Sequence, residues 1–284
     1  ARYNITLTVF QKEWLEALEM DGLKGPLSIH LKLDTGMGRI GIHTEEELKA
    51  ILQTIQQMNH VRLTGVFTHF ATADEADMGF FETQRERFKK MLSIIRKHST
   101  TNPLQIHIGN SAASIRRPNE MYDFIRLGIA MYGLYPSQIV QKQTNIRLEE
   151  AFSLHSRLIH VKKIKKGDSV SYGREFVAQK DEWIGTIPIG YGDGWIRRLT
   201  GSEVLINGKK LPIIGRICMD QTMIRLDQPY DVGTKVTLIG KQENNFISID
   251  EIAEHLNTIN YEVPCMINHR VPRVYKSKQN SIDI

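Results

Sequence analysis

Residues 30–41, HLKLDTGMGRIG, combine a strand pattern with charged side chains that do not suit a plain core strand. His30, Lys32 and Asp34 alternate with leucines, which is the period-two pattern of a strand with one apolar and one polar face. Two glycines and Arg39 follow. An arginine that is held in one position needs an anionic partner, whereas a buried lysine would repel it. The stretch therefore predicts a site at the end of this strand, with an unexplained cation in it.

Histidines, arginines and small polar residues also stand at or near the ends of three later predicted strands. The carboxyl ends of parallel strands are where sheets and barrels of this class carry their functional groups. Any one of these residues alone is most simply a structural polar group. Together they form a ring of hydrogen-bonding groups that a hydrophobic barrel interior would not need. The residues are His69, Asp74, His107, Asn110, Ser111 and Arg126.

The first half of the chain alternates predicted strands and helices. One helix begins with Thr44 and Glu47 in the spacing of a capping box, followed by an apolar stripe. Strands that are separated by helices predict a parallel sheet. The predicted strands are 27–33, 61–70, 104–110 and 123–134, and the predicted helices are 44–59 and 79–98.

After about residue 146 predicted strands follow one another directly. Asn207-Gly208 between two of them is a strong signal for a tight hairpin turn. A single helix, residues 248–259 with Ser248 as its cap, interrupts the series. We therefore predict two domains, an α/β domain over residues 1–146 and a mainly β domain over residues 147–284.

Composition excludes several functional classes. The 284 residues, 41% of them hydrophobic, are ample for a packed core. No apolar run approaches the ~18 residues of a membrane span, and no basic-then-apolar leader is present. Two cysteines far apart in sequence favour a reducing cytosolic setting and no zinc site. The net charge of +5 is spread out, with no aromatic-interleaved basic patch, so a small anionic ligand fits better than nucleic acid.

The length of the first domain leaves two architectures open. A complete (β/α)8 barrel needs roughly 250 residues, about 31 per unit. The first 146 residues hold four or five such units. The domain is therefore either a smaller open α/β sheet or a barrel without its first units.

Eight stretches, in order along the chain, resemble the alanine racemases, and together they cover essentially the whole sequence. The resemblance is greatest to the enzymes of Bacillus-like bacteria. It implies an N-terminal (β/α)8 barrel that binds pyridoxal 5′-phosphate, a C-terminal β domain, a homodimer with shared active sites, and cytoplasmic supply of D-alanine for peptidoglycan of the cell wall. The stretches are LKLDTGMGRIGIH, THFATADE, GNSAAS, RLGIAMYGL, VSYGREF, IPIGYGDGW, GRICMDQ and INYEVPC.

The sequence departs from the family at one motif. The family binds its cofactor through a lysine in a motif similar to K-A-x-A-Y-G-H-G near the start of the barrel. The only Lys-Ala pair here, Lys49-Ala50, stands within a predicted helix. The chain as written thus has no counterpart of the Schiff-base lysine. The resemblance implies that this lysine and the first barrel units precede residue 1.

The resemblance also implies roles for individual residues in a two-base proton transfer. Tyr172 is one base and reaches into the partner's site, His69 is its neighbour, Arg126 faces the pyridine nitrogen and His107 orients Arg126. A free tyrosine has a pKa of about 10, so such a base needs cationic or hydrogen-bonding neighbours. The phosphate is implied to be held by Ser111, Gly128, Ile129 and Tyr261, the substrate carboxylate by Arg39 and the backbone of Met219, and the substrate channel to be lined by Asp74, Tyr191, Arg197, Arg216 and Ile259 with Tyr261.

The cation at Lys32 also finds an interpretation in the resemblance. In many members of the family the matching lysine is carboxylated by carbon dioxide, which turns a cation into an anion beside the arginine. We therefore expect Lys32 to be an N6-carboxylysine that holds Arg39. Two alternatives to alanine racemisation stay open, namely a racemase of another small amino acid such as serine, and a non-catalytic fragment that retains the β domain and part of the barrel.

Overall fold

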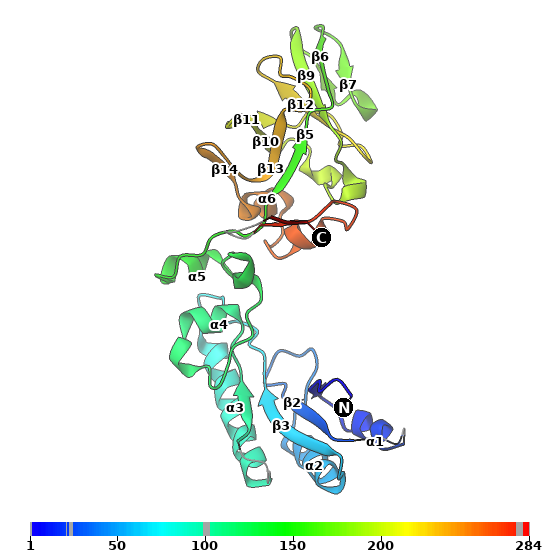
Figure 1. Ribbon diagram of the computed structural model, residues 1–284. Coiled ribbons are helices and arrows are strands. Elements are labelled where there is room, and N and C mark those ends of the chain that lie inside the picture. Colours follow the sequence, from blue (N-terminus) through cyan, green and yellow to red (C-terminus); the bar gives the residue numbers. More distant parts are fainter. Residues whose placement is uncertain (1, 21, 23–24, 99–102, 277–280, 284) are drawn as a thin grey trace. The chain divides into compact units, whose positions relative to one another are not determined.

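The computed structural model describes residues 2–20, 22, 25–98, 103–276 and 281–283, and it divides into two compact units. Unit 1 comprises residues 1–149 and unit 2 residues 150–284 (Figure 1). None of the helices among the described residues is long and apolar enough to cross a membrane.

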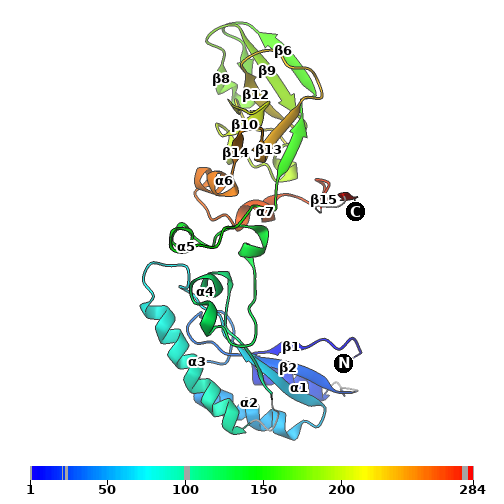
Figure 2. The same cartoon turned by 60° about the vertical axis from the view of Figure 1, so that its left-hand side comes forward.

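Unit 1 is built on a parallel sheet of four strands in the order β1-β2-β3-β4. Helices alternate with the strands, as predicted, and α2 and α3 lie along the sheet (Figure 2). The strands are β1 (Leu7–Val9), β2 (Leu27–Lys32), β3 (Val61–Phe67) and β4 (Gln105–His107), and the helices are α1 (Lys12–Met20), α2 (Glu45–Gln57), α3 (Gly79–His98), α4 (Ser111–Arg116) and α5 (Gln138–Gln143), with short 3-10 helices η1 (Pro118–Glu120) and η2 (Ile129–Tyr132).

Helix α2 begins where its sequence predicts. The Thr44 hydroxyl accepts a hydrogen bond from the Glu47 N–H at 3.1 Å, and a Glu47 carboxylate oxygen accepts one from the Thr44 N–H at 3.1 Å. Such a cap contributes roughly 1 kcal/mol to the helix. Lys49 lies within this helix and pairs with Glu45 at 3.9 Å. It is therefore an ordinary helix-surface lysine.

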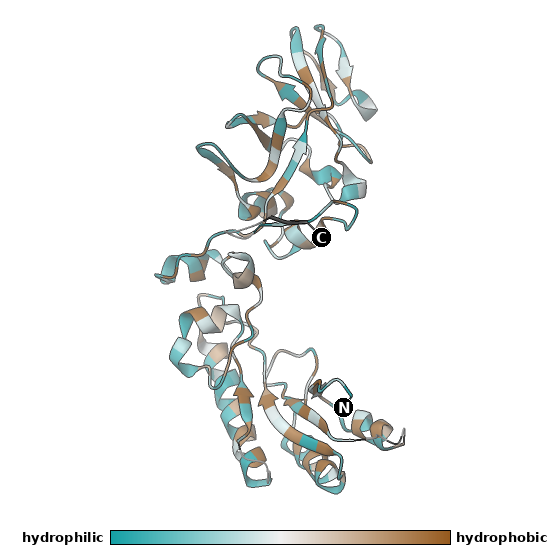
Figure 3. Ribbon diagram, in the orientation of Figure 1, coloured by the Kyte–Doolittle hydropathy of each residue, from teal (hydrophilic) through white to brown (hydrophobic). Residues whose placement is uncertain are grey.

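The core of unit 1 lies between the sheet and its helices. On β2 the residues Ile29 and Leu31 are fully buried against apolar side chains of α2 and α3, such as Leu48 and Phe88. Both helices carry hydrophobic as well as hydrophilic residues (Figure 3). Each such buried side chain contributes about 1.5–3 kcal/mol. Because the apolar residues of β2 face the helices, the polar residues of the same strand must face the other side.

Unit 2 is mainly β, as predicted, with antiparallel pairing throughout. One sheet has the order β11-β10-β13-β14 with β5 also paired to β13, a second has the order β12-β9-β6, and β7-β8 and β15-β16 are separate pairs. The strands are β5 (Leu154–Arg157), β6 (His160–Ile164), β7 (Ser169–Val170), β8 (Phe176–Val177), β9 (Glu182–Ile187), β10 (Glu203–Ile206), β11 (Lys209–Pro212), β12 (Thr222–Leu226), β13 (Lys235–Gln242), β14 (Asn245–Ile247), β15 (Val274–Lys276) and β16 (Ser281–Asp283).

The predicted turn and cap of unit 2 are confirmed. Asn207 and Gly208 join β10 to β11 with φ of 46° and 73°, the paired positive values of a type I′ turn. Ser248 caps α6 (Ile249–Leu256) by accepting from the Glu251 N–H at 2.9 Å. The remaining helices are α7 (Glu262–Met266) and the short η3 (Tyr172–Arg174), η4 (Tyr191–Asp193) and η5 (Arg197–Leu199).

The structure differs from the expected elements in several places. Residues 123–134 are not a continuous strand, because only Ile125 makes a bridge, to Gly109, and η2 follows. The left-handed conformation of Gly133, with φ of 75°, ends that helix. The run FSLHSRLIHVKKI, residues 152–164, predicts one strand but forms two, β5 and β6, in different sheets. Finally, β1 and α1 were not predicted at all.

Candidate functional site

The carboxyl ends of β2, β3 and β4 bring the predicted polar residues of unit 1 to one edge of the sheet. Lys32 and His107 are the last residues of β2 and β4, and His69 follows β3 by two residues. Arg126 joins them because its N–H donates to the Gly109 carbonyl at 2.9 Å. The prediction that strand ends gather polar groups is therefore correct for Lys32, His69 and His107, whereas Arg126 reaches this edge from a segment that is not a strand.

A chain of hydrogen bonds fixes the Arg126 side chain. The His107 Nδ1 lies 2.7 Å from an Arg126 nitrogen, and its Nε2 lies 3.0 Å from the His30 Nδ1. Because a guanidinium only donates, His107 accepts at Nδ1 and donates from Nε2 to His30. Arg126 also donates to the carbonyl oxygens of Thr68 at 2.7 Å and of His107 at 2.8 Å. Gly65 leaves room for the His30 ring, since a Cβ there would lie 2.5 Å from the His30 Nε2.

The electrostatics of this edge keep both histidines neutral. Burial, followed by the Arg126 charge and a neighbouring imidazole, lowers the pKa of His107 to about 3. Burial, followed by the charges of Arg126, Arg39 and Lys32, lowers the pKa of His69 to about 4. Burial also lowers the pKa of Arg126, to about 10. Arg126 is therefore a permanent cation at neutral pH, next to imidazoles that carry no charge.

Lys32 is buried at the same edge, with 3% of its surface exposed. Its Nζ donates to the Leu33 carbonyl at 2.9 Å. Burial lowers the pKa of Lys32 to about 8; the Asp34 charge opposes this shift, and the charges of Arg126 and Arg39 add to it. The side chain is therefore not a surface lysine, and an appreciable share of it is a neutral amine at neutral pH.

The turn after β2 is shaped by Asp34. One carboxylate oxygen accepts from the N–H groups of Gly36 at 3.0 Å and Gly38 at 3.1 Å. Both glycines have positive φ, 141° and 68°, which other residues rarely adopt. Arg39 follows on an exposed position and forms no ion pair within the described residues. Its guanidinium is thus available to an anion.

Ser111 connects α4 to the segment that contains two other predicted phosphate-binding residues. Its hydroxyl oxygen accepts from the Gly128 N–H at 3.0 Å and from the Ala130 N–H at 3.4 Å. A Cβ at Gly128 would meet only that hydroxyl, at 3.8 Å, so the space beside Gly128 is open. Ile129 is buried between these two residues of the segment. The structure therefore places Ser111, Gly128 and Ile129 together.

Sequence reasoning missed Gln84, a fully buried glutamine of α3. Its Nε2 donates to the His69 carbonyl at 3.1 Å and to the Thr35 hydroxyl at 3.3 Å, and its Oε1 accepts from the Ala71 N–H at 2.9 Å. These bonds tie together the segments that follow β2 and β3. The available signal was a polar residue on the apolar stripe between Phe81 and Phe88.

In unit 2, Tyr172 lies on an exposed and unusual turn. Tyr172 is 70% exposed, and the residues on either side, Ser171 and Gly173, have φ of 67° and 72°. The Ser171 hydroxyl donates to the Arg216 carbonyl at 2.5 Å, and the Arg216 side chain pairs with Glu175 across the turn. Non-glycine residues at such φ cost about 1–3 kcal/mol and cluster at functional sites.

Tyr191 and Met219 lie side by side, although they are far apart in sequence. The Tyr191 N–H donates to the Cys218 carbonyl at 3.0 Å. Met219 is 54% exposed, and its own N–H donates to no acceptor within the part of the chain that the structure describes. An exposed, unused backbone donor of this kind suits an anionic ligand.

The other residues of the predicted channel stand apart from one another along the chain. Asp74 belongs to unit 1, where its carbonyl accepts from the Ser137 hydroxyl at 2.7 Å. In unit 2, Arg197 begins η5, Ile259 is exposed beyond α6, and Tyr261 directly precedes α7.

The comparisons with known proteins agree on one family. Residues 1–136 match the family model of the alanine racemase N-terminal domain and residues 151–275 that of the C-terminal domain. The chain is 54% identical over 276 residues to an alanine racemase of Geobacillus stearothermophilus, covering 97% of this chain and 70% of that protein. It is 49% identical to alanine racemase 1 of Bacillus subtilis, covering 100% of this chain and 72% of that protein.

A solved structure supports the same assignment. The crystal structure of alanine racemase from Bacillus anthracis with bound L-Ala-P matches with a TM-score of 0.94 and 44% identity, over 100% of this chain and 73% of that one. The predicted class, an α/β domain of barrel type followed by a mainly β domain, is therefore confirmed. By both sequence and structure, the chain belongs to the alanine racemase family.

Proposed function

We propose that this protein interconverts L-alanine and D-alanine with pyridoxal 5′-phosphate as cofactor, as a cytoplasmic homodimer, and so supplies D-alanine for peptidoglycan. The observation that carries the proposal is the series of hydrogen bonds that joins Arg126, His107 and His30 and holds Arg126 in place. It holds a permanent cation at one edge of the sheet, among residues that match the family motifs. Further support comes from the names of the relatives, which are alanine racemases.

The residues of unit 1 fit this cofactor, which has an anionic phosphate and a ring nitrogen that accepts hydrogen bonds. Arg126 forms no ion pair with any described carboxylate, so its charge is not already neutralised. The Ser111 hydroxyl accepts from two N–H groups and keeps its own proton to donate to a phosphate oxygen. Ser111, Gly128, Ile129 and Tyr261 would hold the phosphate, and Arg126 would face the ring nitrogen.

Each side chain has a distinct task in the proposed reaction. When bound, the cofactor supplies an electron sink for the electron pair left by the departing α-proton. Arg126 would donate to the ring nitrogen and, as a guanidinium, would leave it unprotonated, which would limit side reactions such as transamination. His107 keeps Arg126 in place. Arg39 and the Met219 N–H bind the substrate carboxylate, and so they orient the α-proton.

Tyr172 acts as one of the two bases and works in the partner subunit's site. Its 70% exposure supports a role outside its own unit. His69, neutral at neutral pH, is the proposed hydrogen-bonding neighbour of that tyrosine. Asp74, Tyr191, Arg197, Arg216 and Ile259 line the narrow channel by which a substrate as small as alanine enters.

Lys32 is proposed to carry a carbamate. The neutral amine attacks carbon dioxide: a bond forms between Nζ and the carbon, one C=O π bond breaks and leaves its electron pair on oxygen, and Nζ releases one proton to solvent. The pKa of about 8 leaves enough neutral amine for this reaction. The product is an anion in a cluster of cations, where it would hold Arg39. Mass analysis of intact protein under carbon dioxide should show the adduct, and Lys32→Ala should remove it.

The role of the Lys32 carbamate in catalysis is tested with the Lys32→Ala enzyme. Lys32→Ala should leave Arg39 mobile, weaken substrate binding and lower turnover, and acetate or chloride should partly restore activity. The parent enzyme should not respond to these anions. A Lys32→Ala enzyme as active as the parent without added anion would contradict the carbamate.

The proposed function is tested by incubating the holoenzyme with L-alanine in D₂O. We expect D-alanine to form, with deuterium at Cα in both enantiomers, because each proton removed is replaced from solvent. The same assay with L-serine measures substrate preference. Faster turnover of L-serine would overturn the assignment of alanine, and an absence of deuterium at Cα would overturn racemisation altogether.

A further inference from the structure

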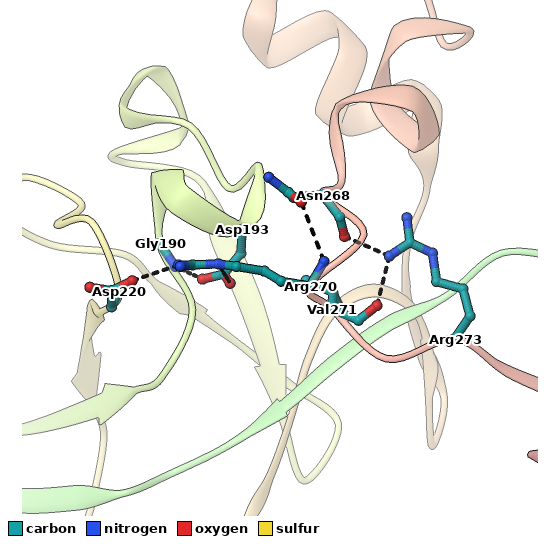
Figure 4. Close-up of polar contacts among 7 residues, drawn as sticks. All are labelled: Gly190, Asp193, Asp220, Asn268, Arg270, Val271 and Arg273. Atoms are coloured by element: carbon teal, nitrogen blue, oxygen red, sulfur yellow. Dashed lines mark hydrogen bonds and ion pairs between the residues drawn. The ribbon is translucent and has the colours of Figure 1, made fainter. Parts of the chain in front are cut away.

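Three segments of unit 2 meet around the backbone of Met219. They are residues 190–194, which contain η4, residues 218–220, which precede β12, and residues 266–270, which begin at the last residue of α7 (Figure 4). The proposed function assigns the Met219 N–H to the substrate carboxylate. A backbone donor on an exposed turn can do this only if other contacts hold the turn in one position.

Backbone hydrogen bonds hold one side of this turn. The Tyr191 N–H donates to the Cys218 carbonyl at 3.0 Å, and the Gly192 N–H donates to the Met219 carbonyl at 2.9 Å. The two segments approach so closely that only glycine fits between them. A Cβ at Gly190 would lie 2.5 Å from the Met219 carbonyl oxygen, and one at Gly192 would lie 3.1 Å from it.

Arg270 holds the other side by linking both segments with its side chain. Its Nε donates to an Asp193 carboxylate oxygen at 2.7 Å, and one terminal nitrogen donates to an Asp220 carboxylate oxygen at 2.5 Å (Figure 4). The second Asp193 oxygen accepts from the Gly190 N–H at 2.9 Å. Asp220 is the neighbour of Met219 in the chain. One guanidinium therefore connects the residue next to Met219 with the segment that binds its carbonyl.

The third segment, residues 266–270, is itself fixed by hydrogen bonds, so the backbone of Arg270 is held in place. The Asn268 N–H donates to the Asp193 carbonyl at 2.8 Å, and the Asn268 side-chain oxygen accepts from the Arg270 N–H at 3.3 Å. A Cβ at Gly192 would lie 2.5 Å from an Arg270 nitrogen, so the guanidinium lies directly against that glycine.

We propose that Arg270 is a positioning residue that fixes the Met219 N–H for the substrate carboxylate. This inference rests on the proposed function and adds a residue that does not touch the substrate. Arginine suits the role because its planar fork bonds two carboxylates in fixed directions, whereas the lysine ammonium is a point charge on a flexible chain.

The kinetic test compares Arg270→Gln and Arg270→Lys with Lys209→Gln in the holoenzyme. Lys209→Gln is the matched control, because it removes another exposed pair of unit 2, with Asp227 at 2.6 Å. In Arg270→Gln, KM for L-alanine and the inhibition constant of propionate should rise about 10-fold, because the carboxylate loses its charge-assisted hydrogen bond from the Met219 N–H. The value of kcat should change less than about 3-fold. Arg270→Lys should lie between this variant and the parent.

An exchange measurement tests the same contact without catalysis. Amide hydrogen exchange of residues 190–194 should become faster in Arg270→Gln and stay unchanged in Lys209→Gln. Parent-like exchange in Arg270→Gln would refute the link between the segments. Faster exchange with unchanged KM and propionate inhibition would refute the role toward the carboxylate and leave the proposed function intact. A parent enzyme that does not racemise alanine would overturn the proposed function, and with it this role.

Discussion

The polar edge of unit 1 and the exposed turns of unit 2 build functional groups in opposite ways. In unit 1, Lys32 and His107 are 3% and 4% exposed, and side chains hold one another. In unit 2, Tyr172 and Met219 are 70% and 54% exposed, and the backbone holds them through glycines, positive φ and carbonyl contacts.

The two units therefore control their functional groups by different physical means. Burial changes the pKa values of unit 1, because desolvation disfavours charge. The exposed turns of unit 2 are not desolvated in this way. They hold their functional groups in position through backbone contacts, such as those of Ser171 and Gly190. Substitutions should therefore act through side-chain hydrogen bonds in unit 1 and through backbone space in unit 2.

The largest expected effect concerns Tyr172, and it separates chemistry from stability. Tyr172→Phe should lower racemisation by about 10²–10⁴-fold in both directions, the usual contribution of a general base. Because the side chain is exposed, the melting temperature and the visible absorbance of bound cofactor should stay as in the parent. Equal turnover of parent and variant would exclude Tyr172 as a base.

A matched pair of glycines tests whether unit 2 depends on backbone space. Gly194 and Gly167 have nearly the same φ, 96° and 92°, but a Cβ would overlap the Met266 carbonyl at Gly194 and meet nothing at Gly167. Gly167→Ala should cost about 1 kcal/mol from strain alone, whereas Gly194→Ala should cost about 3 kcal/mol or more. Urea denaturation measures both. Equal losses would show that space around Gly194 is unimportant.

Two helix glutamines provide the corresponding test in unit 1. Gln84→Ala removes three hydrogen bonds in a fully buried position and should cost about 2 kcal/mol in the free energy of unfolding. Gln56→Ala removes one exposed bond, to the His98 carbonyl, and should change it by less than about 0.5 kcal/mol. If Gln84→Ala is as stable as the parent, the link between the two strand ends carries no energy.

The smallest expected effect is a difference in acid sensitivity. The pKa values of His107 and His69 fall from 6.5 to about 3 and about 4, so the unfolded chain binds more protons in this window. Their contribution to stability is complete above pH 6.5 and is lost as the pH falls toward 3. His107 is buried and His69 is half-buried, so we expect unit 1 to lose stability between about pH 7 and 4.5.

In unit 2 two groups oppose each other. Burial lowers the pKa of His155 to about 4 and raises the pKa of Glu150 to about 7, so acidification costs stability at the first and adds it at the second. Amide exchange of β2 and of β10, corrected for its intrinsic pH dependence, compares the two units. Equal changes in both strands would contradict this assignment.

Local patterns predicted the elements that local physics determines. The helix over residues 79–98, the capping box of α2 and the Asn207-Gly208 turn each depend on residues that are close in sequence, and the structure has all three. Residues 123–134 have the composition of a strand, but the structure is irregular there. An apolar run does not show which of its glycines bends the chain. Strand β1 is only 3 residues long and depends on pairing with β2, so it left no readable period.

The site divides in the same way. The gathering of Lys32, His69 and His107 follows from the rule about strand ends, whereas the position of Arg126 and its bond to His107 do not. His30 and His107 are 77 residues apart, as are Arg270 and Asp193, and no local spacing encodes such a pair. Family resemblance supplied candidate groups that act on ligands, and the structure was needed to find the residues that support them.

The direction of the His107 hydrogen bonds has a spectroscopic consequence. Since Arg126 occupies Nδ1, the Nε2 proton of His107 is shielded from water and donates to another ring at 3.0 Å. A protected imidazole proton of this kind gives a resolved, downfield proton resonance in NMR spectra recorded in water. That signal would report directly on anything that changes the Arg126 environment, without a label and without turnover.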